Sequence, residues 1–267
     1  MREKIFLSAL LIIFITVAFC GCKKSEKVMF LDSIFNRVEI ENDVVYATAE
    51  NEEGKEEPLK LDIYQPLGDL SSTRPLIMWI HGGGFKEGDK KNKGIVQLCK
   101  AFAKRGYIAV SINYRLRKTP MIDIESTIED AVADTVSALN YLRNNASKYR
   151  INTSQIIIGG SSAGGVTALY TACKENQSTS RIFAVVTLWG ALYDSSNVTS
   201  HFPPTIIIHG TNDHIVPYQY SIELQDRLKK LGITYELHSI EGEGHAPWKY
   251  TDEIINWVSH FLFNLID

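Results

Sequence analysis

The sequence has little of what nucleic-acid or metal binding requires. Its 28 Lys and Arg residues are outnumbered by 31 Asp and Glu residues, and the formal net charge is -3. No basic surplus is therefore available to neutralise a phosphate backbone. The 4 cysteines and 7 histidines show no metal-ligand spacing. We therefore expect no nucleic acid, no metal and no cofactor among the partners of this chain.

Long hydrophobic runs are also scarce. The longest, from Ile5 to Phe19, is too short to span a bilayer comfortably, but it follows Arg2 and Lys4. A positive start and an apolar stretch of this length are typical of a secretory signal. The sequence therefore predicts an exported protein whose residues 1–21 are a signal peptide.

A cysteine with a small residue before it follows the apolar stretch. The order Gly21-Cys22 resembles a bacterial lipoprotein cleavage site, at which Cys22 becomes lipidated, whereas Phe19 makes Cys20 a poorer candidate. This predicts a membrane-anchored lipoprotein on the periplasmic or cell-surface side, with residues 22–43 as a tether. A plain secretory signal with incidental cysteines is the alternative.

Only Cys99 and Cys173 remain beyond this segment. They either pair in an oxidising compartment or stay free as small buried side chains. The sequence leaves both possibilities open.

Short apolar runs alternate with helical patterns over the rest of the chain. With 267 residues and 45% hydrophobic content, one sizeable domain over residues 44–267 is expected. Residues 44–49 and 59–66 alternate like a hairpin. Further strands are expected at 76–80, 107–112, 156–159, 184–189, 205–209 and 235–240, and helices at 93–104, 123–144, 163–174, 218–231 and 250–264. The pattern predicts an α/β fold with a mainly parallel sheet, an antiparallel hairpin at one edge and helices on both faces.

A glycine-rich turn follows the strand expected at 156–159. In the frame Gly160-x-Ser162-x-Gly164, Ser162 occupies a sharp strand-to-helix corner where flanking glycines leave room. Shifting the frame to Ser161 would put Ala163 in the place of the last glycine. A phosphate-binding loop would need a lysine or another glycine spacing. Ser162 is therefore the candidate nucleophile.

A second glycine run follows the strand expected at 76–80. In His81-Gly82-Gly83-Gly84-Phe85, no side chains cover the backbone N–H groups of the glycines. These groups are suited to stabilising a developing alkoxide together with the N–H of Ala163. A merely structural tight turn is the alternative.

A serine nucleophile needs a base and an acid to orient it. Asp213 lies a few residues beyond the strand at 205–209, and His245 lies in a glycine-flanked loop after the next strand. The rival base, His214, adjoins Asp213, and neighbouring side chains of an extended segment diverge. The rival acid is Asp194. The order Ser, Asp, His favours Asp213 with His245.

Together these segments resemble the α/β-hydrolase superfamily from about residue 44 onward. The motifs LDIYQP, MWIHGGGFKEGDK, VSINYRL and GGSSAGG are similar to those of bacterial carboxylesterases that include acetyl-xylan and feruloyl esterases. The resemblance implies a nucleophile at Ser162, a base at His245, an orienting acid at Asp213, and oxyanion donors at Gly83 or Gly84 and at Ala163.

The loops suggest an open cleft. About a dozen residues separate the strand ending near Trp189 from Pro203, which leaves no room for a large cap domain. Trp189, Tyr193 and Trp248 are expected on one face, where their rings could stack on sugar or phenolic groups. Core packing is the alternative for them. Phe85 and Ser161, which flank the glycine loop and the nucleophile, are the other candidate substrate-binding residues.

These features predict a serine carboxylic-ester hydrolase acting on acetyl or feruloyl esters of carbohydrate or on similar small esters. A serine peptidase of the dipeptidyl-peptidase type is an alternative on the same fold. A non-catalytic ligand-binding lipoprotein is a third. The intact set of candidate catalytic positions argues against that last possibility.

Overall fold

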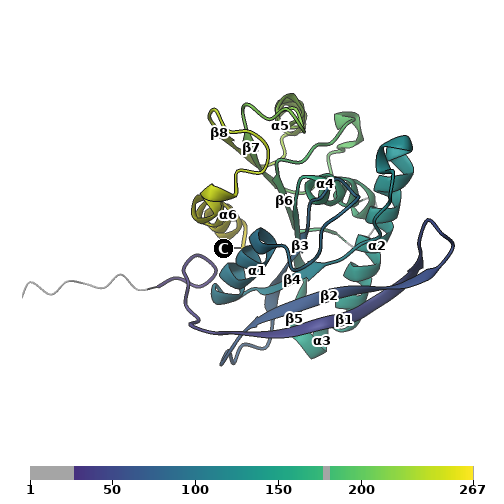
Figure 1. The fold of residues 1–267 in the computed structure, drawn as a ribbon. Coiled ribbons are helices and arrows are strands. Elements are labelled where there is room, and N and C mark those ends of the chain that lie inside the picture. The colour runs from purple at the N-terminus through teal and green to yellow at the C-terminus, as the bar shows by residue number, and fades with distance from the viewer. Residues whose placement is uncertain (1–26, 177–180, 267) are drawn as a thin grey trace, which may run out of the picture.

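An eight-stranded sheet forms the centre of the molecule (Figure 1). The structure is a computed structural model that describes residues 27–176 and 181–266. The spatial order of the strands is β1-β2-β4-β3-β5-β6-β7-β8. Their bounds are Val38–Glu50, Glu56–Pro66, Arg74–Ile80, Ile108–Ile112, Ile151–Ser161, Ala184–Leu188, Thr205–Gly210 and Tyr235–Ile240 for β1 to β8 in chain order.

The sheet is mixed but mostly parallel. Strand β2 is antiparallel to both β1 and β4. Every other neighbouring pair, from β4 through β8, is parallel. The predicted parallel sheet with an antiparallel N-terminal hairpin is therefore confirmed. The expected start of the first strand at residue 44 is wrong: β1 begins at Val38 because ladder pairing with β2 extends to Val38 opposite Pro66.

The central strands are buried on both faces, which explains their unbroken apolar sequence. All seven residues of β3 are buried. Because side chains alternate across a strand, Leu76, Met78 and Ile80 pack on one face, whereas Ile77 and Trp79 pack on the other. Two hydrophobic cores therefore lie on opposite sides of one sheet.

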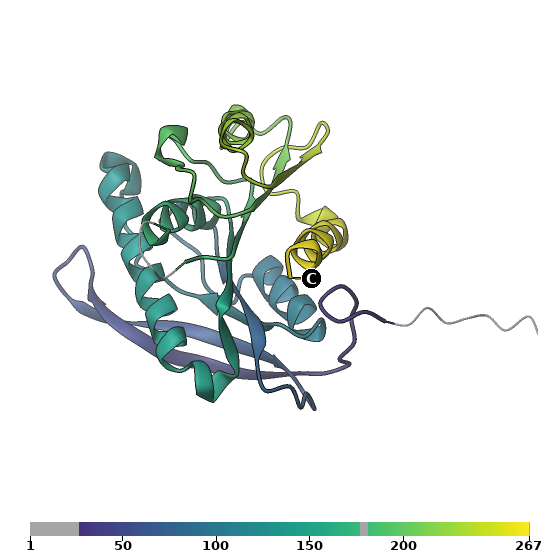
Figure 2. The ribbon, with the colours of Figure 1, turned by 180° about the vertical axis from the view of Figure 1, so that it is seen from behind.

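Helices cover both faces of the sheet, as predicted (Figures 1 and 2). Helices α1 (Lys93–Lys104) and α6 (Thr251–Ile266) pack over the Trp79 side. Helices α2 (Ile124–Asn144), α4 (Ala163–Glu175) and α5 (Gln219–Leu231) supply the core on the Met78 side. Short turns complete the described elements: α3 (Ala146–Tyr149) and the 3-10 helices η1 (Pro120–Ile122), η2 (Ser195–Asn197) and η3 (Trp248–Tyr250).

Local capping explains where several helices begin and end. The side chain of Asn92 accepts hydrogen bonds from the N–H groups of Gly94 and Ile95 at the start of α1, and Asp123 accepts one from Ser126 at the start of α2. Helix α5 ends at Gly232, whose φ of 68° suits a glycine C-cap.

The segment before β1 lies against the domain. The Phe30 ring packs edge-on against Tyr107, and the guanidinium of Arg74 lies over both Phe30 and Phe35. The backbone N–H of Phe30 donates to the carbonyl of Arg105. The predicted tether over 22–43 is therefore wrong for its later part, because aromatic side chains fix it to the body. Cys22 and the predicted signal peptide lie outside the described residues.

The two cysteines left open by the sequence are both free. Cys99 belongs to the core on the Trp79 side and Cys173 packs against the other core. The sheet separates them, and a disulfide needs Cα atoms within about 7 Å.

Among residues 27–176 and 181–266, none of the helices combines the length and the apolar character needed to cross a bilayer.

Candidate active site

The candidate site residues follow the carboxyl ends of four parallel strands. The HGGGF loop follows β3, Ser162 follows β5, Asp213 follows β7, and His245 follows β8. Strands β3 and β5 are neighbours, and the chain proceeds from them toward opposite edges of the sheet. The crevice at such a point is where open α/β sheets bind ligands.

Ser162 sits in a strained corner between β5 and α4. Its φ of 55° and ψ of -120° are unusual for a residue with a side chain, at a cost of roughly 1–3 kcal/mol. The flanking glycines make the corner possible. A Cβ on Gly160 would lie 2.2 Å from the carbonyl oxygen of Gly164, and a Cβ on Gly164 would lie 2.1 Å from that of Ile80. The corner holds the Ser162 hydroxyl away from the sheet.

The structure brings Ser162, His245 and Asp213 together in one hydrogen-bonded series. The distance from His245 Nε2 to Ser162 Oγ is 2.8 Å, and that from His245 Nδ1 to Asp213 Oδ2 is 2.6 Å. In the described part of the chain, the side chains of His214 and Asp194, the rivals considered from sequence, form no hydrogen bond or ion pair with this series. The arrangement can move a proton from a serine hydroxyl to an imidazole that a carboxylate orients.

Four donors surround the Asp213 carboxylate. Oδ1 accepts from the N–H groups of Ile215 and Val216, each at 2.9 Å. Oδ2 accepts from His245 and, at 3.1 Å, from Nε2 of His209. Burial raises the pKa of Asp213, but the hydrogen bonds from His245, Val216 and Ile215 outweigh it, so its pKa lies below the ordinary value. Asp213 is therefore held as an anion.

Backbone N–H groups suited to an oxyanion surround Ser162. In residues 27–176 and 181–266, no acceptor takes a hydrogen bond from the N–H of Gly83, Gly84 or Ala163. Gly83 has a φ of 121°, and a Cβ there would lie 1.9 Å from the carbonyl oxygen of Glu87. Neighbouring Gly82 comes close enough that its Cβ would lie 3.1 Å from that of Ser162. The glycine loop therefore passes directly beside the serine.

Buried polar side chains hold this loop in place. The ring of His81 stacks on Tyr114 at 4.5 Å, and the Tyr114 hydroxyl donates to the His81 carbonyl. Burial lowers the pKa of His81, although its bond to the Gly82 carbonyl opposes that effect. Farther along, Lys90 is buried and forms ion pairs with Asp62 at 2.7 Å and with Asp43 at 2.8 Å. Sequence analysis did not single out Lys90, because nothing local distinguishes a buried lysine from an exposed one.

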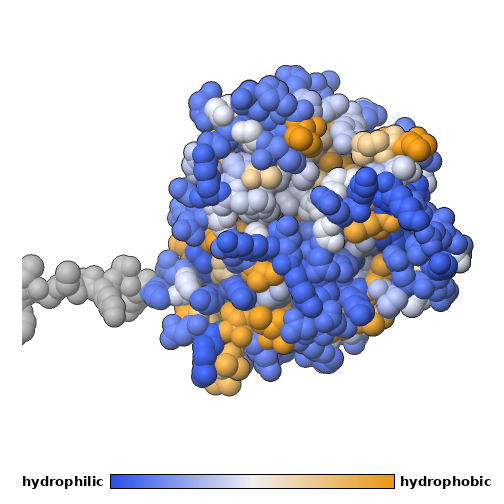
Figure 3. Space-filling view, in the orientation of Figure 1, coloured by the Kyte–Doolittle hydropathy of each residue, from blue (hydrophilic) through white to orange (hydrophobic). Residues whose placement is uncertain are grey.

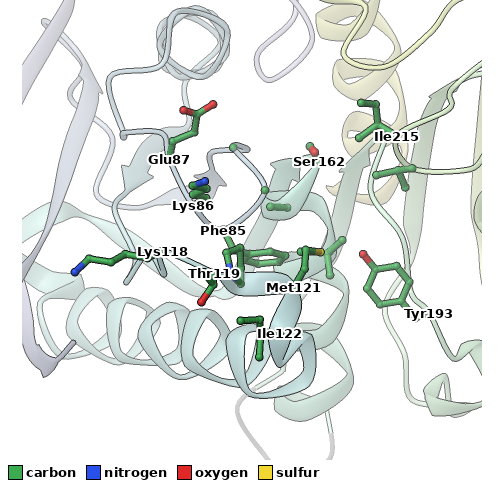
Figure 4. A pocket seen from close by; sticks show the side chains of 16 residues that line it. Phe85, Lys86, Glu87, Lys118, Thr119, Met121, Ile122, Ser162, Tyr193 and Ile215 are labelled. Atoms are coloured by element: carbon green, nitrogen blue, oxygen red, sulfur yellow. The ribbon is translucent and has the colours of Figure 1, made fainter. Parts of the chain in front are cut away.

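A cleft of about 770 Å³ opens beside Ser162. Figure 4 shows Ser162 at its edge, Ile215 and Tyr193 on one side, and Lys86, Glu87 and Lys118 on the opposite side. Apolar side chains make up much of its wall, namely Phe85, Pro120, Met121, Ile122, Val166, Ile215 and Val216.

Part of this apolar lining is exposed to solvent. Met121, Ile122 and Ile215 are 66%, 83% and 74% exposed. Polar residues cover most of the face seen in Figure 3, with apolar patches between them. Met121 and Ile122 belong to η1, which directly precedes α2. An apolar group of moderate size would fit against this rim.

No large cover lies over the cleft in the part of the chain that the structure describes. Between β6 and β7 the described chain forms only η2 and loops, which agrees with the expected lack of a cap domain. Lys118, which lines the cleft, forms an ion pair with Glu53 outside its wall. Within the described ranges, no group of three metal-ligating side chains is present.

Two of the predicted substrate-binding residues are misplaced. Trp189 is 1% exposed and its ring meets Trp248 edge-on at 4.9 Å, within the core on the Trp79 side. Trp248 packs over Gly94 of α1 rather than beside the nucleophile. The prediction that they line the Ser162 cleft is wrong, because both rings face the helix layer. Core packing was the alternative for them.

Of the other residues predicted to bind substrate, some line the cleft and some do not. Phe85 lines the cleft as expected, and so does Tyr193. Ser161 is buried at the end of β5 and is absent from the cleft wall. His209, which lies in the strand expected at 205–209 and was not named as a site residue from sequence, contacts Asp213. Its place near the end of β7, four residues before Asp213, is a local signal of that contact.

Comparison with known proteins gives the same assignment of fold. The BD-FAE family model matches residues 61–192, which include the glycine loop and Ser162, and that of the prolyl oligopeptidase family matches residues 187–263, which include Asp213 and His245. Both matches lie within the region from residue 44 onward where the sequence resembles α/β-hydrolases.

Curated relatives are distant. The chain is 27% identical over 218 residues to a protein described as the probable carboxylic ester hydrolase LipM of Mycobacterium tuberculosis, covering 64% of this chain and 49% of that protein. It is 23% identical to the probable isoprenylcysteine alpha-carbonyl methylesterase ICMEL1 of Arabidopsis thaliana, covering 78% of this chain and 52% of that protein. The chain thus spans about half the length of these two relatives.

Among solved structures, esterase 2 of Thermogutta terrifontis is similar throughout. Its form phosphorylated by paraoxon has a TM-score of 0.68 and 25% identity, covering 85% of this chain and 94% of that one. Its butyrate-bound form has a TM-score of 0.67 and 24% identity, with the same coverage. The mixed sheet, the strand ends that carry the site and these matches together show that the chain has the α/β-hydrolase fold.

Proposed function

We propose that the protein is a serine carboxylic-ester hydrolase that works through an acyl-enzyme. The observation that carries the proposal is the series Ser162–His245–Asp213, with distances of 2.8 and 2.6 Å. The N–H groups of Gly83, Gly84 and Ala163, which have no acceptor among the described residues, also support it.

In the proposed acylation, His245 Nε2 takes the proton of Ser162 as Oγ attacks the ester carbonyl carbon. Asp213 holds the imidazole with its proton on Nδ1 and stabilises the imidazolium. The N–H groups of Ala163 and Gly83 or Gly84 receive the developing alkoxide, and each donor is worth about 3 kcal/mol of barrier. The tetrahedral intermediate collapses when His245 donates its proton to the leaving alcohol. An acyl group remains on Oγ.

Deacylation repeats the sequence with water. His245 removes a proton from the water that attacks the acyl carbonyl, and it then returns that proton to Ser162 Oγ as the acid leaves. The open cleft admits the water. In both half-reactions, the imidazole of His245 accepts and then donates the transferred proton.

For the substrate, we propose small acyl esters, including acetyl or feruloyl esters of carbohydrate. The BD-FAE match, a family of bifunctional acetyl-xylan and feruloyl esterases, favours this class. Thermogutta terrifontis esterase 2 has been solved with propionate and with butyrate bound, and the apolar cleft has room for acyl groups of that size or larger. The uncovered cleft suits an ester attached to a long or bulky alcohol.

The test is hydrolysis of p-nitrophenyl acetate, acetylated xylo-oligosaccharides and methyl ferulate, combined with labelling by a fluorophosphonate. We expect turnover and labelling in the parent chain and neither in Ser162→Ala. Ser161→Ala is the matched control and should keep both. A purified, folded protein that is inert toward every ester and is not labelled would overturn the proposal.

A peptidase is the second candidate, because the prolyl oligopeptidase family matches residues 187–263. That match contains the acid and the base, but it begins at residue 187, after the nucleophile and the glycine loop. Cleavage of dipeptidyl nitroanilides at a kcat/KM above that for any ester would favour the peptidase over the esterase.

For location, we propose that Cys22 anchors the protein to a bacterial membrane. The support is the sequence alone: the charged start, the apolar stretch and the Gly21-Cys22 step. Cys22→Ala should move the protein from the detergent-soluble membrane fraction to the aqueous fraction. If fractionation does not change, the anchor proposal is wrong.

A further inference from the structure

His209 makes a contact for which the Ser162–His245–Asp213 series does not account. Its side chain is fully buried at the end of β7, and Nε2 lies 3.1 Å from the same Asp213 oxygen that faces His245. Nε2 also lies 2.9 Å from the carbonyl oxygen of Val216, and Nδ1 lies 2.7 Å from Ser221 Oγ.

The partners of the ring fix its tautomer. The Val216 carbonyl can only accept, so Nε2 carries the proton and shares it between Val216 and Asp213. Nδ1 of the neutral ring is then an acceptor, and the Ser221 hydroxyl, from the first turn of α5, donates to it. Every polar atom of the imidazole is satisfied in a single orientation.

We propose that His209 is a positioning residue of the active site: its Nε2–H, oriented by Ser221, holds the Asp213 carboxylate so that Oδ2 faces His245. The inference rests on the proposed esterase function. The backbone N–H groups of Ile215 and Val216 hold the other oxygen. Without His209, the donor to Oδ2 among the described residues would be only His245, the imidazole that the carboxylate has to orient.

The neutrality of His209 matters for this role. Burial lowers its pKa, although the bonds to Val216 and Asp213 act in the opposite direction. A charged His209 would pair with the negative charge of the Asp213 carboxylate. That carboxylate would then stabilise the imidazolium of His245 less. The groups that face the ring from other elements are Asp213, His245, Ser221 and the edge of the Tyr218 ring at 5.8 Å.

The first experiment removes the donor. His209→Leu should lower kcat per titrated active site at least about tenfold and leave KM within about twofold, because a loosely held base affects the transition state more than substrate binding. Without this hydrogen bond the carboxylate is more basic and stabilises the imidazolium further, so the acid limb of the kcat/KM profile should move to higher pH. His209→Gln, which keeps a side-chain N–H, should recover most of kcat.

The matched control is His238→Leu. His238 lies on the neighbouring strand β8, opposite Ile208, and its Nε2 pairs with Glu236 rather than with the site. Its kcat and pH profile should equal those of the parent. Active sites are counted with a fluorophosphonate, so that a fall in the folded fraction is not mistaken for a fall in kcat.

Ser221→Ala is the second variant, in case His209→Leu does not fold. It removes one hydroxyl and leaves both histidines, and it should lower kcat several-fold and shift the acid limb in the same direction. A proton NMR spectrum provides a readout that needs no turnover: the downfield resonance of the His245 Nδ1–H should shift or broaden in Ser221→Ala and stay unchanged in His238→Leu.

The outcomes separate the two proposals. If the parent neither hydrolyses esters nor reacts with the fluorophosphonate, the proposed function fails, and the NMR comparison still decides the role of His209. If the variants that fold lose only thermal stability, with kcat per site, acid limb and resonance equal to those of the parent, His209 is structural alone and the inference is overturned.

Discussion

Nε2 of His245 lies 2.8 Å from Oγ of Ser162, although the two residues are 83 positions apart in the chain. Ser162 follows β5 and His245 follows β8, and two further strands, β6 and β7, separate these in the sheet. The contact therefore depends on the length and direction of the loop after β8, which returns across the carboxyl ends of its neighbours. Substitutions in β6 to β8, or in the loop after β8, should therefore change the reactivity of Ser162 toward esters.

Replacement of the orienting acid should leave the fold but remove most of the activity. Asp213→Asn keeps the volume, but the amide presents a donor toward His245 Nδ1 or toward the N–H groups of Ile215 and Val216. We expect kcat to fall roughly 10⁴-fold, because the imidazole takes the wrong tautomer. Steady-state ester hydrolysis measures this. Asp194→Asn, which removes the rival acid at the start of η2, should have little effect; a comparable loss in both variants would contradict the assignment.

The glycine loop should not tolerate a side chain at Gly83. A Cβ there would lie 1.9 Å from the Glu87 carbonyl oxygen, so Gly83→Ala must displace the loop. Loss of one oxyanion donor corresponds to about 3 kcal/mol of barrier, or roughly a hundredfold lower kcat.

The control for Gly83→Ala is Gly68→Ala. Gly68 also has a positive φ, of 82°, but its Cβ would meet no atom within 4 Å and it lies outside the cleft. That variant should lose about 1 kcal/mol of stability and keep its kcat. Equal kcat values for the two variants, at equal active-site titre, would argue against the loop as an oxyanion site.

The apolar rim should influence the choice of acyl chain. Ile215 is 74% exposed and lines the cleft beside Ser162. Ile215→Ser removes apolar contact area, so kcat/KM for p-nitrophenyl butyrate should fall roughly 2- to 5-fold while the value for the acetate changes little. Leu70→Ser, at an exposed residue outside the cleft, is the control. An unchanged butyrate-to-acetate ratio in Ile215→Ser would place the acyl chain elsewhere.

Stability should fall as the pH drops below about 6.5, the ordinary pKa of histidine. Burial lowers the pKa values of His81 and His209 in the folded chain. The unfolded chain therefore binds protons that the folded chain does not, and the free energy of unfolding decreases as the pH falls, by at most about 1.4 kcal/mol per histidine per pH unit.

Urea denaturation at pH 7.5, 6.0 and 5.0 measures this effect. Carboxylates with lowered pKa values, such as that of Asp213, contribute stability that is lost only at lower pH, below about 4. Their effect is thus separated from that of the histidines. A constant free energy of unfolding between pH 7.5 and 5.0 would show that the two buried rings protonate without cost.

Much of the site could be found from sequence because local backbone constraints reveal it. The corner at Ser162 needs glycines at Gly160 and Gly164, since any Cβ there meets a backbone carbonyl. Such requirements involve few residues and leave a motif. The strands could also be predicted from sequence, because burial on both faces of a parallel sheet requires unbroken apolar runs.

Other features were decided only when distant segments packed together. Trp189 and Trp248 were expected in the cleft, yet they pack into the core beneath α1. The segment before β1 was expected to be a tether, yet Phe30 and Phe35 meet Arg74. An aromatic ring is equally suited to a core, a cleft or a clamp, and its neighbours determine which it joins.

Chain-local sterics and the periodicity of strands and helices were enough to predict the α/β architecture, the serine at the glycine corner and the candidates for acid and base. Only the packing of separate segments shows that His209 shares an Asp213 oxygen with His245 and that Trp189 and Trp248 lie in the core rather than in the cleft. The contact of His245 with Asp213 joins loops that follow different strands, and a hydrogen bond between segments that are distant in the chain leaves no periodic trace in the sequence.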